Sequence, residues 1–198
     1  MTLQLDWLRG CATALVTPFT AAGAVDEKRL RELIEYQIAG NVRILVPCGT
    51  TGESVTMNDE ENRLVIRTTV ELSRGRAKVI AGTGSNSTAV TIERSKAARE
   101  LGVDGVLTVA PYYNKPTQEG LYAHFRAVAE AVGDLPVVIY NVPGRTSSNI
   151  SAETTLRLAR DVENIVAVKE ASGNLSQIME ILRERPPGFR VISASTVC

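Results

Sequence analysis

Lys169 stands at the end of an apolar run, and its amine is the group in the sequence best placed for covalent chemistry. Residues 165–168 are isoleucine, valine, alanine and valine, a composition typical of a strand that is buried on both faces. Burial disfavours the charged ammonium, lowers the pKa of the lysine and yields a nucleophilic amine that can form a Schiff base. The alternative is a lysine that reaches from the strand end back to water.

A glycine-rich segment at 49–54, Gly-Thr-Thr-Gly-Glu-Ser, follows another apolar run. Its backbone N–H groups and the hydroxyls of Thr50 and Thr51 can bind an anion, and a small carboxylate fits this donor set. The Gly-Lys-Ser/Thr sequence of a phosphate-binding P-loop does not follow it. An ordinary turn with a helix cap is the alternative interpretation.

Tyrosine and arginine side chains follow two further apolar runs. Tyr140 is suited to moving a proton at a reacting centre, although a core tyrosine is the alternative. Arg145 follows in a Pro-Gly loop, where its guanidinium can bind a carboxylate through two hydrogen bonds or be an ordinary surface group. Tyr112 and Tyr113 are adjacent, so they cannot share one direction in an extended segment, and one of them is expected to pack on a partner subunit.

The elements that must position these groups alternate regularly along the chain. The expected strands are 12–16, 44–47, 78–81, 105–109, 137–140, 165–168 and 190–193. The expected helices are 27–39, 59–73, 87–101, 118–131, 152–159 and 176–185. Such βα alternation indicates a parallel sheet with helices outside it, either open and doubly wound or closed as a barrel. Polar residues gathered at the strand ends favour the α/β class with a (β/α)8 TIM barrel.

We expect residues 1–198 to form a single (β/α) barrel domain. A complete barrel takes about 250 residues. The 198 residues of this chain provide six complete βα units and a seventh strand. The expected fold is therefore a TIM barrel that is truncated after about the seventh strand and lacks the eighth strand and the C-terminal helices.

Composition excludes several classes of protein. Lysine plus arginine and aspartate plus glutamate both number 22, so the net charge is zero, and neither nucleic acid nor an anionic membrane is an expected partner. No apolar stretch approaches a membrane span, and the charged N-terminus is unlike a signal peptide, so a cytoplasmic protein is expected. The only histidine, His124, lies within an expected helix and is interpreted as structural, so no metal site is expected.

Four segments together resemble the dihydrodipicolinate synthase family, within the pyruvate-dependent class I aldolases and N-acetylneuraminate lyases. They are 49–54, 111–116, 140–145 and 168–170, and they occur in the family's order and spacing. The resemblance runs from about residue 11 to residue 188. It implies a (β/α)8 barrel followed by a small helical part. It also implies a Schiff-base carbon–carbon lyase of lysine and diaminopimelate biosynthesis that condenses pyruvate with L-aspartate 4-semialdehyde.

The resemblance also assigns catalytic residues. Lys169 would form the imine with pyruvate, with no other cofactor. Tyr140 would donate and accept protons. Thr50 would connect Tyr140 to Tyr113 in a proton relay, with Tyr113 supplied by the neighbouring subunit of a homotetramer built as a dimer of dimers.

Two further residues would bind substrate by the same resemblance. Thr51 would hold the carboxylate of pyruvate, and Arg145 the carboxylate of L-aspartate semialdehyde. Sister enzymes such as N-acetylneuraminate lyase and 2-keto-3-deoxy sugar acid aldolases share the lysine and the tyrosine, so another Schiff-base aldolase remains an alternative. An inactive truncated fragment is the other alternative.

Feedback by lysine is expected to be weak. Many bacterial members bind lysine at a subunit interface near positions that here are Ser54, Asp59, Asn62, Asn86, Val90 and Tyr112. Asp59 and Asn62 replace histidines of the sensitive type, and Val90 replaces a glutamate. Without that glutamate the ammonium group of the inhibitor lacks its partner.

Overall fold

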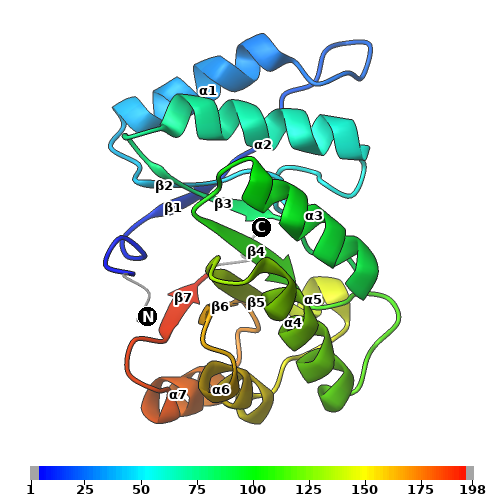
Figure 1. Ribbon diagram of the computed structural model, residues 1–198, viewed down its shortest axis with the longest axis vertical. Coiled ribbons are helices and arrows are strands. Elements are labelled where there is room, and N and C mark those ends of the chain that lie inside the picture. The colour runs from blue at the N-terminus through cyan, green and yellow to red at the C-terminus, as the bar shows by residue number, and fades with distance from the viewer. Residues whose placement is uncertain (1–4, 195–198) are drawn as a thin grey trace. The chain divides into compact units, whose positions relative to one another are not determined.

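The computed structural model describes residues 5–194, which divide into two compact units (Figure 1). The N-terminal unit comprises residues 5–83 and 96–106, and the C-terminal unit comprises residues 84–95 and 107–194. The chain enters the C-terminal unit after Thr83, returns to the N-terminal unit within α3 (Thr88–Glu100) and enters the C-terminal unit again within β4 (Gly105–Val109). That residues 1–198 form one domain stays a prediction.

The N-terminal unit is a set of parallel strands with two helices that lie side by side (Figure 1). Its elements, in chain order, are β1 (Ala12–Ala14), α1 (Glu27–Ala39), β2 (Ile44–Val46), α2 (Asp59–Ser73), β3 (Lys78–Gly82) and the first residues of β4. The helices begin where side chains cap them: Asp26 accepts a hydrogen bond from the backbone N–H of Arg29, and Asn58 forms a capping box with Glu61. Local sequence therefore sets where both helices start.

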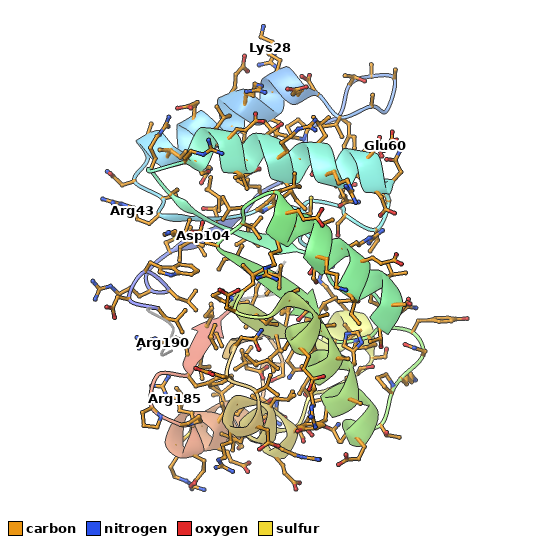
Figure 2. The ribbon with its side chains drawn as sticks, viewed as in Figure 1. Lys28, Arg43, Glu60, Asp104, Arg185 and Arg190 are labelled. Atoms are coloured by element: carbon orange, nitrogen blue, oxygen red, sulfur yellow. The ribbon has the colours of Figure 1, made fainter. Side chains whose placement is uncertain are left out.

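The C-terminal unit repeats the same βα arrangement. Its elements after β4 are α4 (Gln118–Val132), β5 (Val137–Asn141), α5 (Pro143–Thr146), α6 (Ala152–Asp161), β6 (Ile165–Glu170), α7 (Leu175–Glu184) and β7 (Arg190–Ser193). Strands β5, β6 and β7 are parallel and adjacent in that order. Past the end of α7, the guanidinium of Arg185 donates to the carbonyl of Phe189 at 3.1 Å and closes the turn into β7 (Figure 2).

The predicted parallel βα repeat is confirmed. The bounds of β4, β7, α1 and α2 are those predicted, whereas β1 ends two residues early and β6 extends to Glu170. The interpretation of residues 143–146 as a loop was wrong, because they form the short helix α5. Its helical start is favoured by the fixed φ of Pro143 at the first turn.

His124 is a core residue of α4, as the sequence indicates. Its Nδ1 lies 2.9 Å from the hydroxyl of Thr88, and its ring packs edge-on against Phe125 with 5.1 Å between centroids. Burial lowers the pKa of His124 to about 4 because the imidazolium form loses its hydration. The ring is therefore neutral at pH 7 and serves packing.

The turn after β2 is fixed by close backbone contacts. The hydroxyl of Thr17 donates to the carbonyl of Gly52 at 2.7 Å, and a Cβ on Gly52 would lie 2.9 Å from the carbonyl oxygen of Leu15. A Cβ on Gly82, at the end of β3, would overlap the carbonyl group of Cys48. Only glycine lets the end of β3 approach the turn this closely.

We therefore expect Gly82→Ala to lower the free energy of unfolding by about 1–3 kcal/mol, the range for overpacking a well-packed site. Gly49→Ala is the matched control from the same turn, since its added Cβ meets no atom within 4 Å. Urea unfolding of the two variants and the unchanged protein measures the difference. Equal unfolding midpoints for Gly82→Ala and Gly49→Ala would contradict the close-approach argument.

Candidate active site

Lys169 and Tyr140 are brought together by the pairing of β5 with β6. The two residues are direct partners in the parallel register, and the Nζ of Lys169 lies 4.3 Å from the centroid of the Tyr140 ring. An ammonium at this distance is attracted to the face of the ring. Residues 29 apart in the sequence thus form one compact reactive pair.

Partial burial sets the protonation of both groups. Lys169 is half-buried, and the loss of hydration lowers the pKa of its ammonium. Tyr140 is only 5% exposed, and burial raises the pKa of its phenol, while the positive charge of Arg145 acts in the opposite direction. At neutral pH the site therefore combines a protonated phenol with an amine that loses its proton more readily than a free lysine.

Arg145 lies in α5, the short helix that follows Tyr140 and β5 along the chain. The helix starts directly after β5 and ends at Ser147, which adopts a left-handed conformation with φ of 56° and donates its backbone N–H to Pro143 at 2.9 Å. Arg145 is exposed in the last turn, where the helix dipole favours a cation. Its positive charge acts to lower the pKa of Tyr140, so Arg145 lies within electrostatic range of the phenol whose ring faces Lys169.

Tyr113 is attached to the same helix through its backbone. Its N–H donates to the carbonyl of Thr146 at 3.3 Å, and the residue adopts a positive φ of 74°. The side chain is 88% exposed, so it leaves the packed part of its own chain. This direction agrees with the expectation for one of the adjacent tyrosines, and its contribution to a neighbouring subunit stays a prediction.

Thr50 and Thr51 lie in the N-terminal unit, in the turn after β2. Both are exposed, and the backbone N–H of Glu53 donates to the carbonyl of Thr50 at 3.1 Å. Cys48 and Glu53, on either side of the threonines, both adopt positive φ values of 56°. Such strained residues persist only where surrounding contacts hold them, so the turn presents its hydroxyls from a rigid backbone.

Sequence reasoning assigned no role to Glu170, whose carboxylate is the centre of a buried polar network. The side chain is 2% exposed and accepts hydrogen bonds from the amide nitrogens of Asn141 and Gln177. The sequence did contain one indication of its orientation. Successive side chains of a strand point to opposite faces, so Glu170 is expected on the face opposite Lys169. Its partners come from β5 and α7, so the sequence alone did not reveal them.

The described residues provide neither a metal site nor a membrane-spanning helix. Within residues 5–194, the structure groups no three His, Cys, Asp or Glu side chains that could hold a metal ion. Over the same residues, no helix is long and apolar enough to cross a membrane.

Asn62 replaces a histidine expected in lysine-sensitive members of the family, and its side chain makes structural hydrogen bonds. Its Nδ2 donates to the carbonyls of Ser54 and Met57 at 3.2 Å each and of Asn58 at 3.0 Å. The side chain is 7% exposed. Its donors therefore hold the segment before α2, and a ligand would have to compete with these bonds.

Comparison with known proteins places this geometry in a family. The model of the dihydrodipicolinate synthetase family matches residues 7–197. The 4-hydroxy-tetrahydrodipicolinate synthase of Koribacter versatilis is 54% identical over 187 residues, covering 94% of this chain and 62% of the relative. The chain thus spans about three fifths of the length of that relative.

Solved structures of dihydrodipicolinate synthases also match this chain. The crystal structure of dihydrodipicolinate synthase from Aquifex aeolicus matches with a TM-score of 0.90 and 46% identity, over 93% of this chain and 62% of that chain. The enzyme from Cyanidioschyzon merolae, crystallised with lysine bound, matches with a TM-score of 0.90 and 46% identity, over 92% of this chain and 62% of that chain.

These matches confirm the expected fold class, a TIM-barrel fold of which the described residues supply seven strands. The family model covers nearly the whole chain, and the βα repeat and the Lys169–Tyr140 pair are consistent with it. The chain belongs to the dihydrodipicolinate synthetase family.

Proposed function

We propose that this protein acts as a 4-hydroxy-tetrahydrodipicolinate synthase, a Schiff-base lyase that condenses pyruvate with L-aspartate 4-semialdehyde in lysine and diaminopimelate biosynthesis. The observation that carries the proposal is the half-buried amine of Lys169, 4.3 Å from the ring centroid of Tyr140. The name of the Koribacter relative supports the choice of reaction.

The first stage is imine formation. The neutral amine of Lys169 attacks the keto carbon of pyruvate, and the carbinolamine loses water to give an iminium. The departing hydroxyl needs a proton, and the phenol of Tyr140, whose ring centroid lies 4.3 Å from the amine, would donate it. The raised pKa of Tyr140 keeps that proton on the phenol until it is used.

The second stage forms the carbon–carbon bond. The iminium withdraws electrons, so the methyl group of bound pyruvate loses a proton and becomes an enamine. The enamine carbon attacks the aldehyde, whose oxygen takes up a proton. The amino group of the second substrate then attacks the iminium carbon, closes the ring and releases Lys169, so that one water is lost overall.

The remaining residues take supporting roles in the proposal. Thr50 and the partner-facing Tyr113 would relay protons to and from Tyr140, and Thr51 would bind the carboxylate of pyruvate. Arg145 would bind the carboxylate of the semialdehyde, since its exposed guanidinium lies close enough to act on Tyr140. Because Tyr113 would serve a neighbour's site, we propose a homotetramer arranged as a dimer of dimers, in the cytoplasm.

Incubation with pyruvate and borohydride is expected to reduce the imine and add mass at Lys169. Lys169→Arg should abolish the adduct, because a guanidinium does not form the imine. Tyr140→Phe should slow adduct formation by about 100-fold or more, the usual loss of a general acid. Peptide mass spectrometry locates the adduct.

Lys28→Arg is the matched control for the trapping experiment, because Lys28 is exposed on α1 (Figure 2). This variant should keep the full adduct. A soluble, folded protein without any adduct at Lys169 would overturn the proposed function.

The pH dependence of the amine follows from its burial. Because burial lowers the pKa of Lys169, its neutral form should become populated at lower pH than that of an exposed lysine. Competitive acetylation across a pH series, read by mass spectrometry, should therefore give a lower midpoint for Lys169 than for Lys28. A midpoint for Lys169 equal to or above that of Lys28 would contradict the argument.

Inhibition by L-lysine is expected to be weak. Val90 offers no carboxylate to the inhibitor's ammonium, and the donors of Asn62 are already bonded to backbone carbonyls. Steady-state assays with increasing L-lysine test this, and Val90→Glu is expected to raise the sensitivity. Strong inhibition of the unchanged protein at millimolar L-lysine would show the expectation to be wrong.

A further inference from the structure

We propose that Asn141 and Glu170 form a register clamp, a hydrogen-bonded pair that positions Lys169 over Tyr140. Neither residue would touch substrate, so both are positioning residues rather than catalytic ones. The inference rests on the proposed function, because it concerns the rate at which the amine of Lys169 forms its imine.

The register clamp and the reactive pair occupy consecutive positions of the same two strands. Tyr140 pairs with Lys169, and Asn141 pairs with Glu170, in the parallel register of β5 and β6. Successive side chains of a strand point to opposite faces of the sheet. The reactive pair therefore lies on one face, and the register clamp lies directly behind it on the other.

The register clamp is made of short contacts in a dry environment. The Nδ2 of Asn141 lies 3.2 Å from one carboxylate oxygen of Glu170 and 3.0 Å from the other. Asn141 and Glu170 are 0% and 2% exposed. A carboxylate so buried is strongly disfavoured unless donors surround it, so the position of Glu170 depends on keeping these bonds.

Two more donors complete the surroundings of Glu170. The backbone N–H of Ser172 donates to Oε1 at 2.7 Å, and the Nε2 of Gln177 donates to Oε2 at 3.1 Å. The Oδ1 of Asn141 in turn accepts the backbone N–H of Ile150 at 2.9 Å. The register clamp is thereby tied to the segment after β6, to α7 and to the segment before α6, so neither strand can shift alone.

The strand pair needs such a clamp because its register is interrupted. Val137 pairs with Ile165, but the next residue, Val138, pairs with Ala167, so β6 carries one extra residue at this point. A slip of one residue reverses the face to which every side chain points. A further slip would remove Lys169 from Tyr140, and the Asn141–Glu170 bonds favour the register that keeps them together.

The test compares imine trapping in single and exchanged variants. Glu170→Gln leaves one acceptor oxygen for the three donors of Asn141, Ser172 and Gln177, so its own NH2 group faces a donor. Asn141→Asp places two carboxylates together. Each is expected to lower the maximal rate of trapping with pyruvate and borohydride on the order of 100-fold, the effect of a misplacement of about 1 Å. The pyruvate concentration for half-maximal rate should stay unchanged, because neither residue would bind pyruvate.

The double variant Asn141→Asp with Glu170→Gln is the decisive arm. It restores an acceptor opposite a donor with the roles exchanged, while the amide of Asn149, whose Oδ1 accepts from Asn141 at 2.9 Å, turns to donate to the new carboxylate. The double variant should therefore recover at least about tenfold of the rate lost in the single variants, the equivalent of one hydrogen bond. Failure to recover would overturn the paired role. Glu180→Gln, the same charge change on the exposed side of α7, should trap at the unchanged rate.

Controls separate this inference from the proposed function. No adduct in the unchanged protein would overturn the function, whereas normal trapping by Glu170→Gln would overturn the register clamp alone. Circular dichroism checks that each variant folds. If a single variant does not fold, Glu170→Asp, which keeps the charge but withdraws the carboxylate from Asn141 by one methylene, serves instead. A lower maximal rate in it at an unchanged half-saturating concentration supports the inference, and the unchanged rate overturns it.

Discussion

The register between β5 and β6 is the constraint on which the candidate site depends. Tyr140 and Lys169 are adjacent only in this register. The register is established after an irregularity in the pairing, where β6 carries one extra residue. Backbone hydrogen bonds of a parallel pair would form equally well after a slip of one residue. Side chains must therefore select the register, and apolar burial does so poorly here because both faces of β6 are buried.

Burial has different consequences on the two faces of β6. On the face of Lys169, loss of hydration lowers the pKa of the amine and raises that of the Tyr140 phenol. On the opposite face, the carboxylate of Glu170 is buried among amide donors. The same apolar strand that lowers the pKa of the amine also buries Glu170 at its end, and this polar group needs partners because a buried group without them would destabilise the fold.

The sequence predicted most of the fold because each βα unit carries its own local signals. Apolar runs located the strands, and capping residues such as Asp26 and Asn58 agree with the predicted starts of α1 and α2. Lys169 was predictable because a charged residue ends an apolar run. Helix α5 was not, because four residues beginning Pro-Gly carry no helical periodicity. The partners of Glu170 were hidden by sequence separations of 29 and 7 residues, which only the folded strands and α7 bring into contact.

Backbone strain gives a further, independent indication of where function lies in this fold. Within residues 5–194, six non-glycine residues have positive φ, and five of them follow the carboxyl ends of strands: Cys48, Glu53, Tyr113, Lys115 and Ser147. Each such conformation costs of order 1 kcal/mol or more, so it persists only where other contacts hold it. In barrels of this class the carboxyl ends of the strands carry the chemistry. The turns that present Thr50, Tyr113 and Arg145 are therefore held in place by the fold, because an unconstrained chain would relax to less strained conformations.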